Sequence, residues 1–448
     1  MTPNVVFRAT GNLADLDSAT RAVLMSRAGA RDTQVGARTA DIIRDVRARG
    51  DDALREMAYT FDHAVLQSLE VPRENWTCAL SALAPDVRHA LERAARNIQS
   101  VHQAFLPTAF ETSPEPGITV GRRPDPLARV GVYAPGGRAA YPSSLLMGAI
   151  PARVAGVGEV IVCSPPSANG EVSSVVLAAA ALANVDRVFA IGGAGAIAAM
   201  ALGTTSVPRV DRIVGPGNAY VAEAKLQLVG QVAIDSPAGP SELFVLADSD
   251  AKPDVIAREM AAQAEHDPDV AVIAVLFGDD AAIQAKRTLE ALEKVLEISP
   301  RSAIMLEAFA ARGALLTADN LDRALQFANA WAPEHLLLAI RPSSQDEALS
   351  RVRAAGTVFV GETSSVAFGD YMTGANHVLP TAGLARCYSG LSTLDFVRWT
   401  SWQRVSREAA RGLSRDVGVF ADAEGLPAHA AAARFWTENT QFSNMKTS

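Results

Sequence analysis

The chain has 448 residues, of which 49% are hydrophobic and 20% charged, a composition that excludes disorder as the main state. At roughly 100–200 residues per domain, this length allows about two to four domains. The formal charge of −8, from 41 Lys+Arg against 49 Asp+Glu, argues against a nucleic-acid-binding protein, which would carry a basic face. Cys78, Cys163 and Cys387 lie far apart without paired spacing, which indicates a reducing compartment rather than a disulfide framework.

Two features of the sequence bear on membranes. The amino terminus lacks the apolar core of a signal peptide. Apolar runs such as Val175–Leu182 and Val270–Phe277 are far shorter than the roughly 20 residues that a membrane-spanning helix needs. We therefore expect a cytoplasmic protein that binds neither membranes nor nucleic acids.

Residues 1 to about 110 show helical spacing without the alternation typical of a strand. In Ala37–Phe61 the apolar residues recur every three or four positions, and Gly50 interrupts the pattern. Pro85–Leu106 repeats this spacing, with a proline where helices favour one. Pro107–Gly131 is rich in proline and glycine, which indicates a connector with short extended pieces.

From Val130 onward, short runs rich in β-branched residues alternate with helical stretches. One series runs from RVGVYAP to QVAID, and a second runs from ELFVLAD at Glu242 to TVFVG. This alternation is typical of parallel sheets that are buried on both faces. We therefore predict an α/β protein with two doubly wound, Rossmann-like parallel-sheet domains, which would fit an ancient duplication. The helical region precedes them, and a helical tail is expected beyond Phe396.

Two of the histidine-containing segments pair polar residues at the ends of predicted elements. Gln263 and His266 are three positions apart near a helix end, so their side chains share one face. Glu334 and His335 begin an apolar strand, a place where catalytic groups often lie in α/β proteins. Because successive side chains of an extended segment point to opposite sides, these two should not share one role unless the backbone bends there.

Two further segments have a similar character. Asp370 and His377 lie in a turn-rich stretch, and Glu424 and His429 lie five apart near the carboxyl end. Each of the four pairs also has an ordinary explanation as a polar helix end, a strand end or a solvated loop. The other histidines fit solvated or core-edge positions: His63, His89 and His102.

Glycine-rich turns suggest phosphate binding. Gly193, Gly195 and Ala198 form a G-x-G-x-x-A pattern after a strand, which resembles the dinucleotide fingerprint, although close helix–sheet packing explains it equally well. Val132–Ser144 and Val214–Lys225 each follow a strand and open a helix, so that backbone N–H groups would point outward as phosphate sites require.

Taken in order, several long motifs resemble the signatures of the histidinol dehydrogenase family, over about residues 37–432. The motifs are VYAPGGRAAYPSSLLMGAIPARVAGV, VDRIVGPGNAYVAEAK, IDSPAGPSE, QAEHDP, APEHL, GDYMTGANHVLPT and EGLPAH. The resemblance implies oxidation of L-histidinol through the aldehyde to L-histidine, the last steps of histidine biosynthesis. It also implies one Zn²⁺ per subunit, two NAD⁺ per turnover, and a homodimer with shared active sites.

The resemblance assigns roles residue by residue. The implied zinc ligands are Gln263, His266, Asp370 and His429. The implied catalytic pair is Glu334 and His335, with His335 taking the alcohol proton and Glu334 deprotonating the water that adds to the aldehyde. The implied substrate contacts are Ser241, Gln263, His266, His335, Asp370, His377, Glu424 and His429. The implied cofactor contacts are Tyr133, Gly195 and Asn218. Glu424 and His429 would reach into the partner subunit's site.

The resemblance also implies a domain organisation. It consists of an amino-terminal segment (1–36), a substrate and metal domain (37–131 with 241–391), a cofactor-binding Rossmann-like domain (132–240) and a helical dimerisation tail (392–448).

Some residues depart from the family pattern. Gly195 stands where the family usually has a cofactor-contacting glutamine, and the SSVAFGDYMTGANH stretch and the tail also differ. One alternative is therefore a paralogous zinc and NAD dehydrogenase of another small polar alcohol such as dihydroxypropanesulfonate. In that case Arg398 and Arg404 would serve an anionic substrate, unless they are ordinary surface arginines. An alternative of another class is a non-catalytic α/β protein that binds a small molecule, which would need neither an acid/base pair nor a metal set.

Overall fold

The computed structural model describes residues 5–27, 33–136 and 140–438. The chain divides into two compact units, one made of Met1–Phe105 with Leu127–Phe396 and the other of Leu106–Pro126 with Val397–Ser448. In the part of the chain that the structure describes, no helix is long and apolar enough to cross a membrane.

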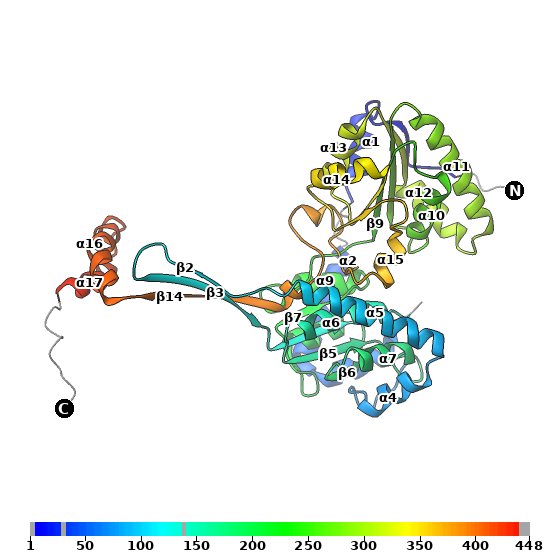
Figure 1. Cartoon of the computed structure of the whole chain (residues 1–448). Helices are drawn as coiled ribbons and strands as arrows, with labels where there is room; N and C mark the ends of the chain where they lie inside the picture. Colours follow the sequence, from blue (N-terminus) through cyan, green and yellow to red (C-terminus); the bar gives the residue numbers. More distant parts are fainter. Residues whose placement is uncertain (1–4, 28–32, 137–139, 439–448) are drawn as a thin grey trace. The chain divides into compact units, whose positions relative to one another are not determined.

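The first parallel sheet, sheet A, has the strand order β1-β11-β10-β9-β12-β13. Its strand β9 is labelled in Figure 1. Its strands are β1 (Ala9–Asn12), β9 (Glu242–Ala247), β10 (Ala271–Phe277), β11 (Ala314–Ala318), β12 (His335–Ala339) and β13 (Thr357–Val360). Every residue of the central strand β9 is buried, as expected for a parallel sheet covered on both faces.

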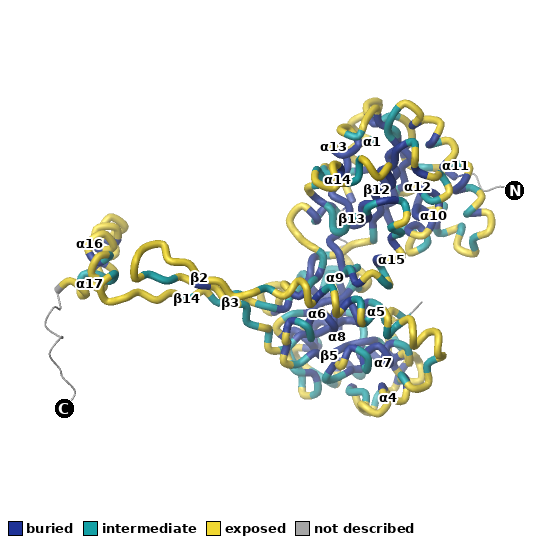
Figure 2. The backbone as a smooth tube through the Cα atoms, in the orientation of Figure 1, coloured by how far each residue is buried: buried dark blue, intermediate teal, exposed yellow. Residues whose placement is uncertain are grey.

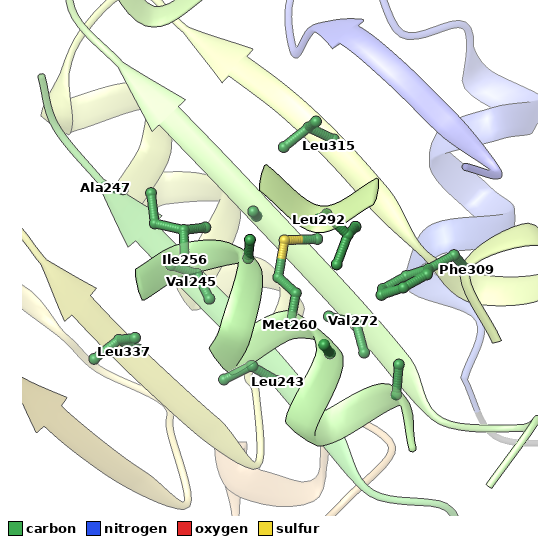
Figure 3. Packing of buried hydrophobic residues seen from close by; sticks show 14 of the residues in the cluster. Leu243, Val245, Ala247, Ile256, Met260, Val272, Leu292, Phe309, Leu315 and Leu337 are labelled. Carbon is green, nitrogen blue, oxygen red and sulfur yellow. The ribbon is translucent and has the colours of Figure 1, made fainter. Parts of the chain in front are cut away.

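Helices cover both faces of sheet A. On one face Leu243 and Val245 pack with Met260 and Phe309, which Figure 3 shows in close view. The helices of this layer are α10 (Pro253–Ala264), α11 (Ala281–Ile298) and α12 (Ser302–Arg312). On the other face Phe244 packs at 5.5 Å from the ring of Trp331. The helices there are α1 (Ser18–Met25), α13 (Leu321–Trp331) and α14 (Pro342–Arg351), while α15 (Val366–Tyr371) follows β13.

The second parallel sheet, sheet B, has the order β6-β5-β4-β7-β8. Its strands are β4 (Arg129–Tyr133), β5 (Glu159–Ser164), β6 (Arg187–Ala190), β7 (Arg212–Val214) and β8 (Ala233–Ile234). When the strands are renumbered from 1 along the chain, starting at β4 in sheet B and at β9 in sheet A, both sheets have the order 3-2-1-4-5. Sheet A has β1 as an additional edge strand. The prediction of two doubly wound, Rossmann-like halves is confirmed.

The helices between residues 33 and 104 pack in the sheet B domain. Ile43, Val46 and Leu54 share a core with Phe189 and Ile197 of this domain. The helices in this layer are α2 (Thr33–Arg49), α3 (Asp51–Phe61), α8 (Gly193–Leu202) and α9 (Ala219–Gln227). A second layer, in which α6 contacts the strands, contains α4 (Arg73–Ala82), α5 (Pro85–Ala104), α6 (Pro142–Val154) and α7 (Ser174–Leu182).

This packing differs from the expected grouping of residues 37–131 with residues 241–391. Helical periodicity shows which face of a helix is apolar, but it does not show which of two similar sheets that face covers. The amino terminus also differs from its helical prediction, because β1 pairs with β11 in parallel.

The second unit is an antiparallel ribbon followed by two packed helices. Its order is β14-β3-β2, with β2 (Phe110–Thr112), β3 (Ile118–Pro126) and β14 (Val397–Val405), followed by α16 (Arg407–Ala423) and α17 (Pro427–Glu438). Two short 3-10 turns precede β14 in the chain, η1 (Leu384–Arg386) and η2 (Thr393–Phe396). The prediction of a purely helical tail is therefore wrong over its first nine residues, and the connector contains a strand of equal length. Both strands are largely exposed (Figure 2), so they lack the apolar period that identifies a strand.

Candidate active site

The Glu334–His335 pair lies at the amino end of β12. Ala332, whose φ of +54° is left-handed, caps the carboxyl end of α13, and Glu334 occupies a bend before the strand begins. Both side chains are buried, and Glu334 Oε2 lies 3.4 Å from His335 Nδ1. The side chains therefore meet because the backbone bends, which is the exception to the expected opposite orientation.

His335 is held by the main chain of the neighbouring strand. Its Nδ1 lies 2.9 Å from the backbone oxygen of Glu242, and its Nε2 lies 3.7 Å from Asp370 Oδ1. This Nε2 is buried and has no hydrogen-bond partner among the described residues. Burial opposes the charged imidazole, but the carboxylates of Glu334 and Asp370 outweigh it and raise the pKa of His335 well above its usual value.

Asp370, on α15, lies among three histidines. Burial opposes ionisation of its carboxyl group, but the neighbouring His335 side chain, with smaller contributions from His377 and His266, holds its pKa below the usual value. The Nδ1 of His377 lies 2.8 Å from the backbone oxygen of Asp370, and its Nε2 lies 3.3 Å from Ser144 Oγ. Burial lowers the pKa of His377, which favours its neutral form.

Gln263 and His266 lie at the carboxyl end of α10, as their spacing predicts. Gln263 is buried, and His266 is exposed with its Nδ1 3.1 Å from the backbone oxygen of Gln263. In His266, His335 and His377 alike, a main-chain carbonyl faces Nδ1. In His266 and His335 this leaves Nε2 as the nitrogen available for a ligand or a proton, whereas Nε2 of His377 faces Ser144. Ser241 is half-buried directly before β9.

The expected metal ligands lie in different parts of the molecule. Within residues 5–27, 33–136 and 140–438, no three His, Cys, Asp or Glu side chains approach closely enough to hold a metal ion together. The first unit supplies one imidazole (His266), one carboxylate (Asp370) and one amide (Gln263) of the expected set. His429 and Glu424 belong to the second unit, where both are exposed, at the start of α17 and the end of α16. Their role in a partner subunit's site stays a prediction.

Tyr133 and Asn218 lie at the carboxyl ends of β4 and β7, on the two sides of the point where the strand order reverses. The N–H of Gly193 donates to the Tyr133 hydroxyl at 3.0 Å, and burial raises the pKa of Tyr133 to about 12. Asn218 Oδ1 caps α9 by accepting from two backbone N–H groups at 3.1 Å. In open α/β sheets this edge is where dinucleotides bind.

A buried ion pair shapes the turn before Asn218. Lys225 Nζ donates to Asp235 Oδ1 at 2.7 Å and to the backbone oxygen of Gly215 at 2.5 Å. Asp235 Oδ2 accepts from the Gly215 N–H at 2.8 Å. Gly215 has a φ of +114°, and a Cβ there would lie 2.1 Å from the Tyr133 backbone oxygen. Only glycine fits this close approach.

Gly195 lies against α3. A Cβ at this position would be 2.9 Å from Met57 Sδ and 3.4 Å from Leu54 Cδ2. The geometry therefore favours the packing explanation of this glycine over a side-chain contact with a cofactor. Residues 137–139 of the first glycine-rich turn lie outside the described residues.

Sequence reasoning missed Glu242 and its partner Arg27. Glu242 is the first residue of β9, and both side chains are almost completely buried, with Arg27 Nε 3.3 Å from Glu242 Oε1. Burial raises the pKa of Glu242 to about 7. The available signal was a single acidic residue at the head of an otherwise apolar strand.

Comparison with known proteins gives consistent results. The family model for histidinol dehydrogenase matches residues 25–436. A histidinol dehydrogenase of Methanothermobacter thermautotrophicus is 45% identical over 395 residues, covering 88% of this chain and 92% of the relative. One from Methanosarcina barkeri is 44% identical over 423 residues, covering 94% and 96%. The crystal structure of histidinol dehydrogenase from Elizabethkingia anophelis matches with a TM-score of 0.91 at 32% identity, covering 97% of this chain and 99% of that one.

Proposed function

Since the chain belongs to the histidinol dehydrogenase family, we propose that it oxidises L-histidinol through the aldehyde to L-histidine with zinc and NAD⁺. The observation that carries this proposal is the buried Glu334–His335 pair, whose free Nε2 faces Asp370. Membership in an oxidoreductase family also replaces the alternative of a non-catalytic binding protein.

The residues present fit a zinc ion. Imidazole nitrogen and carboxylate oxygen are common zinc ligands, and Asp370 is already an ionised carboxylate surrounded by imidazoles. Gln263, His266 and Asp370 would hold the ion, and His429 of a second subunit would complete a four-ligand set. When bound, the zinc ion would anchor the substrate as a Lewis acid and offset the negative charge that keeps His335 protonated, while NAD⁺ would accept hydride.

The chain's own residues perform two proton transfers. His335 Nε2 removes the proton of the alcohol hydroxyl, since Nδ1 is engaged with the Glu242 carbonyl. Glu334 removes a proton from the water that adds to the aldehyde, because it is the carboxylate adjacent to His335. Ser241 directly precedes β9, and His377 lies against the Asp370 backbone; both would orient the substrate.

The proposal includes a cytoplasmic homodimer in which Glu424 and His429 complete the partner's site. Mixing two inactive variants, His335→Ala and His429→Ala, tests this arrangement. Hybrid dimers would contain one site with both residues intact, so part of the activity should return. If hybrids form without recovered activity, the second unit serves its own subunit.

The substrate is tested with a panel of alcohols that includes L-histidinol and dihydroxypropanesulfonate, followed by NADH formation. We expect turnover of L-histidinol, about one zinc per chain, and loss of turnover on chelation or in His266→Ala. Turnover of only the sulfonate would establish the paralogous activity instead. The arginines suggested for an anionic substrate have other contacts, since Arg398 pairs with Asp125 at 3.6 Å and Arg404 lies 5.7 Å from the Trp402 ring centroid.

A further inference from the structure

Strand β9 carries a buried carboxylate at each end. At the amino end Glu242 pairs with Arg27, and at the carboxyl end Asp248 accepts from Arg341 Nε at 3.0 Å. The carboxylates are 2% and 4% exposed, so both are removed from water. A buried carboxylate costs free energy unless it is paired, so each arginine compensates a charge that the strand would otherwise not tolerate.

Only the amino-end residue contacts the catalytic pair, and it does so through its main chain. The N–H of Glu242 donates to Glu334 Oε2 at 2.6 Å. The carbonyl oxygen of Glu242 lies 2.9 Å from His335 Nδ1. One residue therefore determines both the orientation of the Glu334 carboxylate and the ring nitrogen that His335 offers to a substrate.

The side chain of Glu242 holds this main-chain segment in place through contacts with Ala382 and Arg27. Its Oε1 accepts from the Ala382 N–H at 2.7 Å and lies 3.3 Å from Arg27 Nε. Arg27 in turn stacks 3.6 Å from the ring centroid of Trp331 and donates to the Trp331 backbone oxygen. Trp331 is the last residue of α13, three positions before Glu334. Arg27 thus ties the start of β9 to the segment that delivers the catalytic pair.

We propose that Glu242, held by Arg27, is a positioning residue that aligns Glu334 and His335 for the reaction. This inference rests on the proposed function for the identity of that reaction. With the Glu242 carbonyl on Nδ1, the proton of neutral His335 stays on that nitrogen, and Nε2 remains the acceptor. With the Glu242 N–H on one carboxylate oxygen, Glu334 keeps its other oxygen for the incoming water.

The test compares Glu242→Gln with the matched control Asp248→Asn, which neutralises the buried carboxylate at the other end of the same strand. Glu242→Gln keeps the side-chain volume but leaves Arg27 without its counter-charge, so the start of β9 should shift. We expect kcat to fall by about 10–100-fold, with KM for L-histidinol and zinc content unchanged. Asp248→Asn should lose thermal stability but retain the parent kcat.

A structural role would lower stability in both variants and leave kcat per folded molecule unchanged, and that result overturns the proposal. An equal loss of kcat in the two variants also overturns it. If Glu242→Gln does not fold, Glu242→Asp replaces it, since it keeps the charge but withdraws the carboxylate from Ala382 and Arg27; the same kcat and KM criteria apply.

A second measurement does not depend on turnover. Histidine-selective ¹⁵N labelling reports the tautomer of each imidazole, and His335→Asn assigns the His335 signals. We expect protonated Nδ1 and unprotonated Nε2 in neutral His335 of the zinc-loaded parent, and a mixture of tautomers in Glu242→Gln. An unchanged His335 spectrum overturns the positioning role. If the spectrum changes but the parent does not oxidise L-histidinol, the proposed function fails and the positioning role stands.

Discussion

The two parallel sheets share one strand order, but their candidate residues lie at opposite ends of the strands. In sheet B, Tyr133 and Asn218 follow the carboxyl ends of β4 and β7, where the order reverses. In sheet A, Glu242 and His335 stand at the amino ends of β9 and β12, the corresponding strands. Topology therefore explains the position of the candidate cofactor site, but it does not explain the position of the acid/base pair.

The two ends of the strands in sheet A differ in whether their buried polar atoms have hydrogen-bond partners. At its carboxyl edge, Asp248 accepts from the N–H and the Nε of Arg341 and from the N–H of Asp250. At its amino edge, Glu242 Oε2 and His335 Nε2 are buried without a hydrogen-bond partner in the described part of the chain. A native protein rarely leaves such atoms unpaired except at sites with a function. The unpartnered atoms therefore agree with the proposed acid/base site at the amino ends of the strands.

The largest expected effect separates the two members of the pair at the amino edge. Removal of a positioned general base costs about 10²–10⁴-fold in rate. His335→Asn should therefore fail on the alcohol, whereas Glu334→Gln should still form NADH from the alcohol in a single turnover and fail on the aldehyde. The measurement supplies alcohol and aldehyde separately. Because the two side chains lie 3.4 Å apart, equal loss of both steps in both variants would mean that the pair acts as one unit.

The buried Lys225–Asp235 ion pair of the sheet B domain should matter chiefly for stability. Asp235→Asn leaves Lys225 buried without its counter-charge, and breaking a buried ion pair costs about 3–5 kcal/mol of unfolding free energy. Urea unfolding measures this loss. The N–H of Gly215 would also lose the Asp235 carboxylate as its acceptor, so KM for NAD⁺ should also rise. An unchanged unfolding free energy would show that the pair contributes nothing to the turn.

Asn218 should affect the cofactor without affecting the fold. Asn218→Asp keeps the oxygen that caps α9, but it places a negative charge at the helix start where the sequence suggests that phosphate groups of the cofactor bind. We expect KM for NAD⁺ to rise by about tenfold, equivalent to 1.4 kcal/mol, with KM for L-histidinol unchanged. Asn320→Asp is the matched control, because Asn320 caps α13 beside sheet A in the same way. If both variants change KM for NAD⁺ equally, the cofactor does not bind at the carboxyl edge of sheet B.

The smallest effect concerns acid stability. Burial lowers the pKa of His102, on α5, to about 4, below its usual 6.5. The unfolded chain therefore binds the proton first, so stability is full above pH 6.5 and falls as the pH drops toward 4. The loss should be about 1 kcal/mol per pH unit within that window. Denaturation of the parent and His102→Leu at pH 7 and pH 5.5 measures it, with the exposed His89→Leu as control. Equal acid sensitivity in all three proteins would contradict the assignment.

Sequence patterns predicted the parts of the fold that repeat a simple rule. The β-branched runs after Val130 became two parallel sheets, and Gly50 separates two helices as expected. The same patterns missed β3 and β14, because a ribbon exposed on both faces has no apolar period.

The candidate site was predictable where a motif named a residue. Asp370 lies 3.7 Å from His335 Nε2, His266 lies near Asp370, and Gln263 is buried on α10; their role as zinc ligands stays a prediction. The role of Glu242 was not predictable, because it depends on main-chain atoms that any residue possesses. The burial of its side chain against Arg27 is a tertiary fact, formed by residues 215 positions apart in the chain.

The left-handed alanine before the acid/base pair affects how the site responds to a substrate. An alanine in this conformation costs about 1–2 kcal/mol, a cost that glycine would not incur. Alanine, however, has fewer backbone conformations than glycine, so the junction between α13 and β12 is a poor hinge. Ala332 is also completely buried. The geometry of Glu334 and His335 is therefore set when the protein folds, and motions that admit or release a substrate must take place in other segments.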